Sequence, residues 1–301
     1  MIDLYLMSPP SPGWALRGRA NFRSQNAPAV DAAAARREWL ALAEAIEARG
    51  GTVIALEPPS DELSGMPYAA ECGHVIARED APPLFVLPRM AKPHRQGERA
   101  CWQPLAEAMG LEVVDPGEGI WEAQGDVAEL DGCTLLFYGG RTDRAGMEAA
   151  ARFFPGETLA IEIREPAFHG NMAVLPLPFV DRMLVCREVL VGEAWDKLVH
   201  RFGEARLLPV TEAEIREYAT NGLPVGDTLL APSLVPERVA RLVASLGMRV
   251  ERLTLRELCD KAGGASRCLV SRARVEEKHV RLPEENRLAR IAAAIRQERS
   301  S

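Results

Sequence analysis

The sequence predicts an α/β fold assembled from five related units. The first observation behind this prediction is a repeated order of helix, glycine-containing turn and apolar strand. In each copy Leu, Ala, Val or Phe recur three or four residues apart, which places one apolar face on a helix. The second observation is that short apolar segments between the copies have the composition of buried strands. The copies span residues 40–58, 103–116, 147–163, 195–210 and 239–253.

Each copy is expected to end its helix in the same way. Glycine follows the last apolar turn, where a positive φ costs least, and a short segment rich in Val, Ile and Leu comes next. The strands expected between the copies cover residues 73–77, 84–88, 125–130, 133–139, 171–177, 182–186, 227–232 and 267–273. One helix and several strands therefore recur about every 45 to 60 residues.

Two architectures agree with this repeat. Five units can close in a ring in which each unit covers the apolar face of its neighbour, as repeat and propeller proteins do. An ordinary open α/β sheet with accidental similarity between its parts gives the same local pattern. The repeat alone leaves both architectures open.

The C-terminal segment differs from the repeats in composition. We expect residues 1–275 to form a single domain and residues 276–301 to form a charged C-terminal helix or tail. Pro283 stands where that helix is expected to start, followed by acidic residues and, near the end, arginine. Such a helix packs on the outside or mediates self-association, which leaves a homodimer open.

Composition excludes several classes of protein. A net charge of −7 argues against a sequence-independent nucleic-acid binder. The six cysteines form no CxxC pair, which argues against a zinc site and a dense disulfide framework. The N-terminus lacks the features of a signal peptide, and no apolar run reaches the roughly 18 residues that a membrane span needs. We therefore expect a cytoplasmic protein with no membrane association and no metal.

Three positions carry residues suited to nucleophilic catalysis. Cys268 follows two glycines and Arg267, and a neighbouring cation favours the thiolate. His169 stands next to a glycine just before an expected strand, and Glu122 and Asp126 flank Gly125 before another strand. Each has a structural explanation when taken alone: a buried cysteine, a core histidine, or a turn that uses Asp and Gly. Together they provide the cysteine, histidine and carboxylate that attack and hydrolysis require.

The motifs around these residues resemble those of the guanidine-modifying (pentein) superfamily. This superfamily includes dimethylarginine dimethylaminohydrolases, arginine deiminases and amidinotransferases. The resemblance implies a five-bladed ββαβ propeller, the pentein fold, with its site at the centre. The matching segments are GIWEAQGDV (119–127), AFHGN (167–171), GGASRCL (263–269), RQGE (95–98), YGGRTDRAG (138–146) and ATNGLPVGD (219–227).

The resemblance also implies a role for each residue. Cys268 would be the nucleophile, and His169 the general acid and then the general base. Glu122 would orient His169, while Arg95 and Arg141 would hold a substrate carboxylate. The thiolate would attack a guanidinium carbon, release an amine and leave a covalent thiouronium, which water then hydrolyses. No metal or organic cofactor is implied, because the thiol does the covalent work.

The first unit departs from the family pattern. In the segment 64–73, Gly65 stands where the family has its first guanidinium-binding acid, and Glu71 stands where the family has Asn or Asp. We expect Glu71 and Asp126 to contact the substrate. Asn171 replaces an acid of deiminases and amidinotransferases that dimethylarginine hydrolases also lack, which favours a hydrolase.

The sequence therefore predicts a cysteine-dependent hydrolase. Its substrate would be a small molecule with a guanidino or amidino group, as for a dimethylarginine dimethylaminohydrolase. The alternatives are an amidinotransferase with the same three residues, an arginine deiminase-like enzyme, a non-catalytic binding protein of this fold, and a cysteine hydrolase of unrelated fold.

Overall fold

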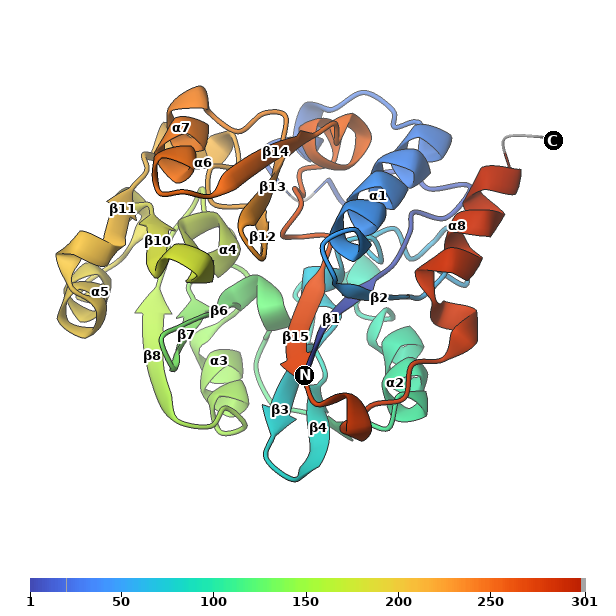
Figure 1. Cartoon of the computed structure of the whole chain (residues 1–301), viewed down its shortest axis with the longest axis horizontal. Helices are drawn as coiled ribbons and strands as arrows, with labels where there is room; N and C mark the ends of the chain where they lie inside the picture. The colour runs from blue at the N-terminus through green and yellow to red at the C-terminus, as the bar shows by residue number, and fades with distance from the viewer. Residues whose placement is uncertain (20, 299–301) are drawn as a thin grey trace.

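The computed structural model describes residues 1–19 and 21–298, and within them lie five three-stranded sheets. In each sheet the middle strand is antiparallel to the strand before it and parallel to the strand that follows a helix. Figure 1 shows the sheets around the middle of the molecule, with α1, α2, α3, α5 and α7 on the outside. The predicted α/β fold of five ββαβ units with a C-terminal helix is therefore confirmed.

The strands are numbered in the order in which they occur along the chain. They are β1 (Ile2–Met7), β2 (Thr52–Ala55), β3 (His74–Arg78), β4 (Ala81–Val86), β5 (Glu112–Val114), β6 (Val127–Leu130), β7 (Cys133–Tyr138), β8 (Glu157–Glu162), β9 (Val174–Leu177), β10 (Arg182–Val185), β11 (Leu207–Pro209), β12 (Leu223–Val225), β13 (Thr228–Pro232), β14 (Arg249–Leu253) and β15 (Ser271–Val275). The sheets are β15-β1-β2, β3-β4-β5, β6-β7-β8, β9-β10-β11 and β12-β13-β14.

The α-helices are α1 (Ala32–Glu47), α2 (Arg99–Ala108), α3 (Arg144–Ala151), α4 (Gly170–Ala173), α5 (Ala194–Phe202), α6 (Glu212–Arg216), α7 (Glu237–Ser245) and α8 (Leu288–Gln297). Glycines with positive φ end the helices of the five units, as the repeat predicts. They are Gly50, Gly110, Gly156, Gly203 and Gly247. Each reverses the chain so that the next strand runs back beside the middle strand of its sheet.

The two ends of the chain complete the first unit together. β1 pairs antiparallel with β15 through Leu4 and Ala273, and parallel with β2 through Leu4 and Thr52. The first strand of this unit therefore comes from the end of the domain. This pairing ties the end of the domain to its beginning and so closes the ring of units.

Several expected strand boundaries were wrong. β9 begins at Val174, because residues 170–173 form the short helix α4, and β15 begins only at Ser271. Cys268 therefore lies in a turn before β15. The strand β1 was not expected from the sequence, whereas β12 lies inside the segment 219–227 that the resemblance implies to be a strand. The acidic residues placed in the first turn of the C-terminal helix lie in the preceding 3-10 turn, Glu284–Asn286.

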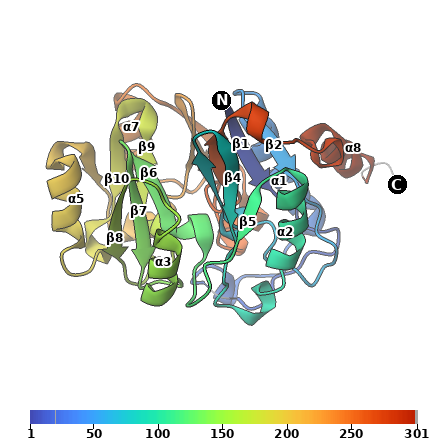
Figure 2. The same ribbon diagram turned by 90° about the horizontal axis from the view of Figure 1, so that it is seen from below.

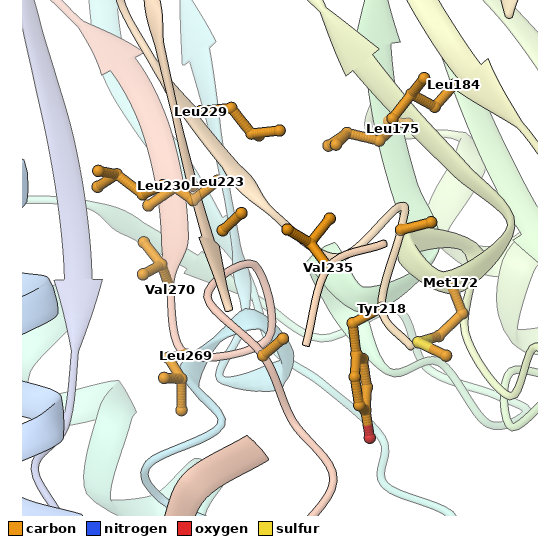
Figure 3. Packing of buried hydrophobic residues seen from close by; sticks show 14 of the residues in the cluster. Met172, Leu175, Leu184, Tyr218, Leu223, Leu229, Leu230, Val235, Leu269 and Val270 are labelled. Atoms are coloured by element: carbon orange, nitrogen blue, oxygen red, sulfur yellow. The ribbon is translucent and has the colours of Figure 1, made fainter. Parts of the chain in front are cut away.

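The C-terminal helix α8 packs against α1 at the periphery of the molecule (Figure 2). Its buried residues Leu288, Ile291 and Ile295 belong to the same hydrophobic core as Trp39 of α1. Figure 3 shows another part of this core, where Leu175, Leu184 and Leu229 of neighbouring sheets point toward one another. Of the helices in the described part of the chain, none combines the length and the apolar character that crossing a bilayer requires.

Candidate active site

The candidate site residues precede the first strands of different units. Glu71 lies just before β3, Glu122 before β6, His169 before β9, Asn221 before β12 and Cys268 before β15. Because the units surround a common centre, these equivalent segments converge there although they are far apart in the sequence. The structure brings all of the site residues predicted from the sequence into this central region.

His169 and Glu122 form a short contact in the interior. The Nε2 atom of His169 lies 2.6 Å from Oε2 of Glu122, and both side chains are fully buried. The backbone N–H of Ala91 donates to the other carboxylate oxygen at 2.9 Å. The Nη1 atom of Arg141 lies 3.6 Å from Oε2 of Glu122. The carboxylate of Glu122 is thus held on both oxygens, which fixes the orientation of the imidazole.

Electrostatics keeps Glu122 ionised and favours protonation of His169. Burial raises the pKa of Glu122, but the hydrogen bond from His169 and nearby positive charges hold it well below its usual range. Burial lowers the pKa of His169, but Glu71, Asp126 and Glu122 together hold it above its usual value. An imidazole in this environment can give a proton to a leaving group and take one back.

Asp126 holds the backbone of Gly170 and the side chain of Thr142 in place beside His169. Its carboxylate accepts from the N–H of Gly170 at 2.7 Å and from the hydroxyl of Thr142 at 2.7 Å. Thr142 in turn accepts from the N–H of Glu122 at 2.9 Å. Burial raises the pKa of Asp126 to about 6, although His169 and these hydrogen bonds lower it. Both oxygens of Asp126 are therefore engaged; substrate contact by this residue stays a prediction.

Arg95 lies at the site, and its guanidinium is already engaged. It is buried, bonds to Glu71 and to both oxygens of Glu98, and donates to the carbonyl of Gly65 at 2.9 Å. A Cβ atom at Gly65 would lie 2.2 Å from Nε of Arg95 and 2.2 Å from Oε1 of Glu98. Glycine at this position is thus explained by the space that the Arg95–Glu98 pair takes up. Sequence reasoning missed Glu98, although it lies three residues after Arg95 in the RQGE motif.

Glu71 connects this pair to the histidine. Its Oε2 atom binds Arg95, and its Oε1 atom lies 3.4 Å from Nδ1 of His169. That ring nitrogen is buried and has no hydrogen-bond partner among the described residues. One carboxylate oxygen and one ring nitrogen therefore face the site without a hydrogen bond between them. Oxygens of Glu71 and Glu122 and a nitrogen of His169 lie within 4.8 Å of one another, a grouping that could also hold a metal ion.

Cys268 is buried, with about 2% of its surface exposed. Its Sγ atom lies 3.7 Å from Nδ2 of Asn171, whose Oδ1 atom accepts from Asn221 at 3.0 Å. Burial and the charge of Glu71 raise the pKa of Cys268 to about 12, against the opposing effects of Asn221 and nearby arginines. The thiol is therefore protonated at neutral pH unless a cation enters the site.

A pocket opens over the cysteine. It has a volume of about 600 Å³ including its mouth, and Cys268, Glu71 and Arg141 line it together with Tyr68, Phe168 and His94. The guanidinium carbon of Arg141 stands 4.6 Å from the ring centroid of Phe168. Gly264 packs closely on Tyr68, since a Cβ atom there would lie 2.2 Å from its ring. The pocket combines an acid near the thiol with basic groups nearer its mouth.

The raised pKa of Cys268 predicts how it reacts with electrophiles. A neutral reagent such as chloroacetamide should alkylate Cys268 slowly at pH 7, and its rate should rise about tenfold per pH unit below the thiol pKa. Chloroacetamidine has the same shape and a positive charge, which favours the thiolate beside Glu71. We expect chloroacetamidine to modify Cys268 at least about tenfold faster than chloroacetamide at pH 7. Peptide mass mapping measures both rates.

The other cysteines provide the controls for this experiment. Cys101 is partly exposed and Cys72 is buried near the site. Neither lines the pocket, so the two reagents should modify each of them at similar rates. Labelling by chloroacetamidine that is spread evenly over the six cysteines, or concentrated on Cys72, would contradict the assignment of Cys268 as the reactive thiol.

Comparisons with known proteins show structures of the same fold. The N-terminal domain of ArgZ with bound product, described as an arginine dihydrolase from cyanobacteria, superposes with a TM-score of 0.82 at 22% identity, covering 91% of this chain and 99% of that one. Unliganded AgrE superposes with a TM-score of 0.81 at 21% identity, and the superposition covers 93% of this chain and 40% of the AgrE chain. The adduct of a dimethylarginine dimethylaminohydrolase with S-methyl-L-thiocitrulline superposes with a TM-score of 0.69 at 17% identity. The superposition covers 91% of this chain and 100% of that one.

Sequence comparison gives a weaker result. An uncharacterised protein of Caenorhabditis elegans is 25% identical over 247 residues, which are 81% of this chain and 85% of the relative. No protein-family model matches the chain. The comparisons therefore show the fold, and the chemistry has to be argued from the residues of the site.

Proposed function

We propose that this chain, which has the pentein fold, is a cysteine-dependent hydrolase that acts on a C–N bond of a substituted guanidine. The observation that carries the proposal is the buried contact of 2.6 Å between His169 and Glu122 beside a pocket lined by Cys268 and Glu71. A nucleophile, an acid–base group and a carboxylate that orients it are the three parts that covalent hydrolysis requires.

Substrate binding activates the nucleophile in the proposed mechanism. The guanidinium enters beside Glu71, and its positive charge offsets the burial that keeps Cys268 protonated. The thiol gives its proton to solvent, and the thiolate attacks the guanidinium carbon, so that a C–S bond forms. His169, protonated with the help of the surrounding carboxylates, gives its proton to the departing nitrogen. The C–N bond breaks, an amine is released, and a covalent thiouronium remains on Cys268.

Hydrolysis completes the proposed cycle. His169, now neutral, takes a proton from a water molecule whose oxygen adds to the thiouronium carbon. The C–S bond then breaks, the ureido product leaves, and Cys268 returns as a thiolate that is reprotonated. Glu122 stabilises the imidazolium in the first half and holds the same ring orientation in the second.

The charges in the pocket support a substrate with both a cationic and an anionic end. Glu71 has one oxygen engaged by Arg95 and one near His169, so a guanidinium can share the second oxygen. Arg141, held over the ring of Phe168, is placed to meet a substrate carboxylate. Neighbours described as an arginine dihydrolase and as a dimethylarginine dimethylaminohydrolase adduct support arginine or a methylated arginine as the substrate.

Two other reactions use the same residues. Loss of ammonia from unsubstituted arginine, as a deiminase or dihydrolase carries out, is favoured by the likeness to the arginine dihydrolase domain. Transfer of the amidino group to an amine would make the chain an amidinotransferase. The Asn171 side chain beside Cys268 favours a reaction of the dimethylarginine hydrolase type over both, because deiminases and amidinotransferases of the family have an acid there.

A product assay tests the proposed function. The protein is incubated with arginine, monomethylarginine and asymmetric dimethylarginine, each with and without glycine or ornithine as acceptor. We expect release of ammonia, methylamine or dimethylamine from one of these substrates together with a ureido product, and no dependence on the acceptor. Release of ornithine that requires glycine, together with a guanidino product formed from the glycine, identifies an amidinotransferase. No amine from any substrate would contradict the proposal and favour a binding protein.

A further inference from the structure

A second pocket lies behind the nucleophile. It is lined by residues of β3, β6, β9 and β15 and of the segments before β6, β9 and β15, among them His74, Gln124, Glu129, Asn171, Arg267 and Arg272. Asn171 lines this pocket and also contacts Sγ of Cys268, at 3.7 Å. The second pocket is thus separated from the catalytic thiol by one side chain. The mechanism proposed above uses none of its charged groups.

His74 presents a buried donor to this pocket. The amide of Gln124 is fixed by the backbone of Arg272, from which it accepts at 2.7 Å and to which it donates at 2.7 Å. This fixes which end of the amide carries the nitrogen, and that nitrogen lies 3.0 Å from Nδ1 of His74. Nδ1 is therefore the acceptor and Nε2 carries the proton in neutral His74. Nε2 is buried and has no hydrogen-bond partner among the described residues.

Two arginines bring positive charge to the same pocket. Arg267 is about 6% exposed and donates through Nη1 to the carbonyl of Val270 at 2.8 Å. The guanidinium of Arg272 makes one long contact, 3.4 Å to the carbonyl of Pro224. In the described part of the chain no carboxylate lies within 4.0 Å of either guanidinium. Burial, and secondarily Arg272, lower the pKa of Arg267 to about 9, as expected for a guanidinium without a close counter-ion.

Glu129 compensates these charges only in part. Among the described residues, Nε2 of His74 is the basic atom that comes within 4.0 Å of its carboxylate, at 3.8 Å, which is longer than a hydrogen bond; the Glu129 side chain is 61% exposed. One partly solvated carboxylate thus faces two guanidinium groups and a buried N–H donor. A buried charge without a partner is costly, and an anion that accepts from these donors would remove that cost.

We propose that the pocket lined by His74, Arg267 and Arg272 is a binding site for a small oxyanion, a carboxylate or inorganic phosphate. Oxygen acceptors suit this site because arginine binds them in a bidentate manner and His74 offers a further donor at a different angle. The site is separate from the proposed substrate pocket, since it lies on the other side of Asn171 from the thiol.

The experiment compares two substitutions on the same strand. Arg272→Gln removes a guanidinium from the pocket, while Arg274→Gln removes one whose side chain is 73% exposed and does not line it. Thermal unfolding is followed in sodium phosphate, sodium acetate and sodium chloride at equal ionic strength. For the unmodified protein and Arg274→Gln we expect a saturable rise in Tm with phosphate or acetate, on the order of 2–4 °C at about ten times the Kd. Arg272→Gln should show no such rise.

A third variant tests whether the carboxylate of Glu129 weakens oxyanion binding. Glu129→Gln removes the competing carboxylate from a largely exposed position, so it should fold and should bind the oxyanion several-fold more tightly. Calorimetric titration with phosphate and with acetate measures the Kd of each variant and tells the two oxyanion sources apart. Equal Tm shifts in all variants, equal shifts in chloride, no shift with either oxyanion, or weaker binding by Glu129→Gln would overturn the proposal.

Discussion

Replacing Cys268 with serine should abolish turnover of the guanidine substrate. We expect kcat to fall by at least about 10⁴-fold, or about 5.5 kcal/mol of transition-state stabilisation. A hydroxyl is a much weaker nucleophile than a thiolate, and burial beside Glu71, which already raises the pKa of the thiol to about 12, would disfavour an alkoxide still more. Steady-state rates of amine release, with circular dichroism as a check of the fold, measure the effect.

A second cysteine variant controls for effects of the substitution itself. Cys101 lies in α2, is partly exposed and does not line the pocket, so Cys101→Ser should keep full activity. Mass spectrometry of the unmodified protein during turnover should find the thiouronium on the peptide that contains Cys268. A Cys268→Ser protein that folds and retains more than about a tenth of the activity would refute the assignment of the nucleophile.

Replacing Glu122 with glutamine should reduce kcat by about 10² to 10⁴-fold. The amide keeps the size of the side chain and removes the negative charge next to His169. Three carboxylates hold the pKa of His169 above its usual value, so removal of one of them must lower it. A smaller fraction of the imidazole is then protonated at neutral pH, and proton donation to the leaving amine is impaired.

The pKa of His169 can be measured without turnover. An NMR titration of the imidazole in the Cys268→Ser protein should give a pKa above 6.5, and the double variant with Glu122→Gln should give a lower one. Glu118 is exposed and lies four residues earlier in the chain, so Glu118→Gln changes the net charge equally and should alter neither the pKa nor kcat. An unchanged pKa in the Glu122→Gln protein would contradict the role given to this carboxylate.

The helices and most strands follow from the sequence for a local reason. The apolar face of a helix, the glycine that ends it and the apolar strand after it are all encoded within about twenty residues. Each of the five repeats therefore has its predicted helix and strand in the structure. The strand β1 was missed. β1 gains its stability by pairing with β15 at the other end of the domain, and a local pattern does not encode a partner so distant.

The active-site residues were found in the sequence by type and motif. The motifs of the sequence indicate Cys268, His169 and Glu122, and the structure places them at the centre because each precedes the first strand of its unit. Asn171, from the segment of His169, contacts the thiol and is itself held by Asn221 from a further segment. The convergence of five such segments depends on closure of the ring, which is a property of the whole chain.

Electrostatics at the site was decided by the tertiary structure alone. From the sequence, Gly65 looked like a lost acid and Arg95 like a free ligand for a carboxylate. In the structure Glu98 fills the space beside Gly65 and pairs with Arg95, which also binds Glu71. Burial raises the pKa of Cys268; it lowers that of His169, but three neighbouring carboxylates outweigh it and hold the pKa of His169 above its usual value. The sequence therefore determines which reactive groups this protein has, and the fold decides their charge, because pKa depends on solvent exclusion and on neighbours that are distant along the chain.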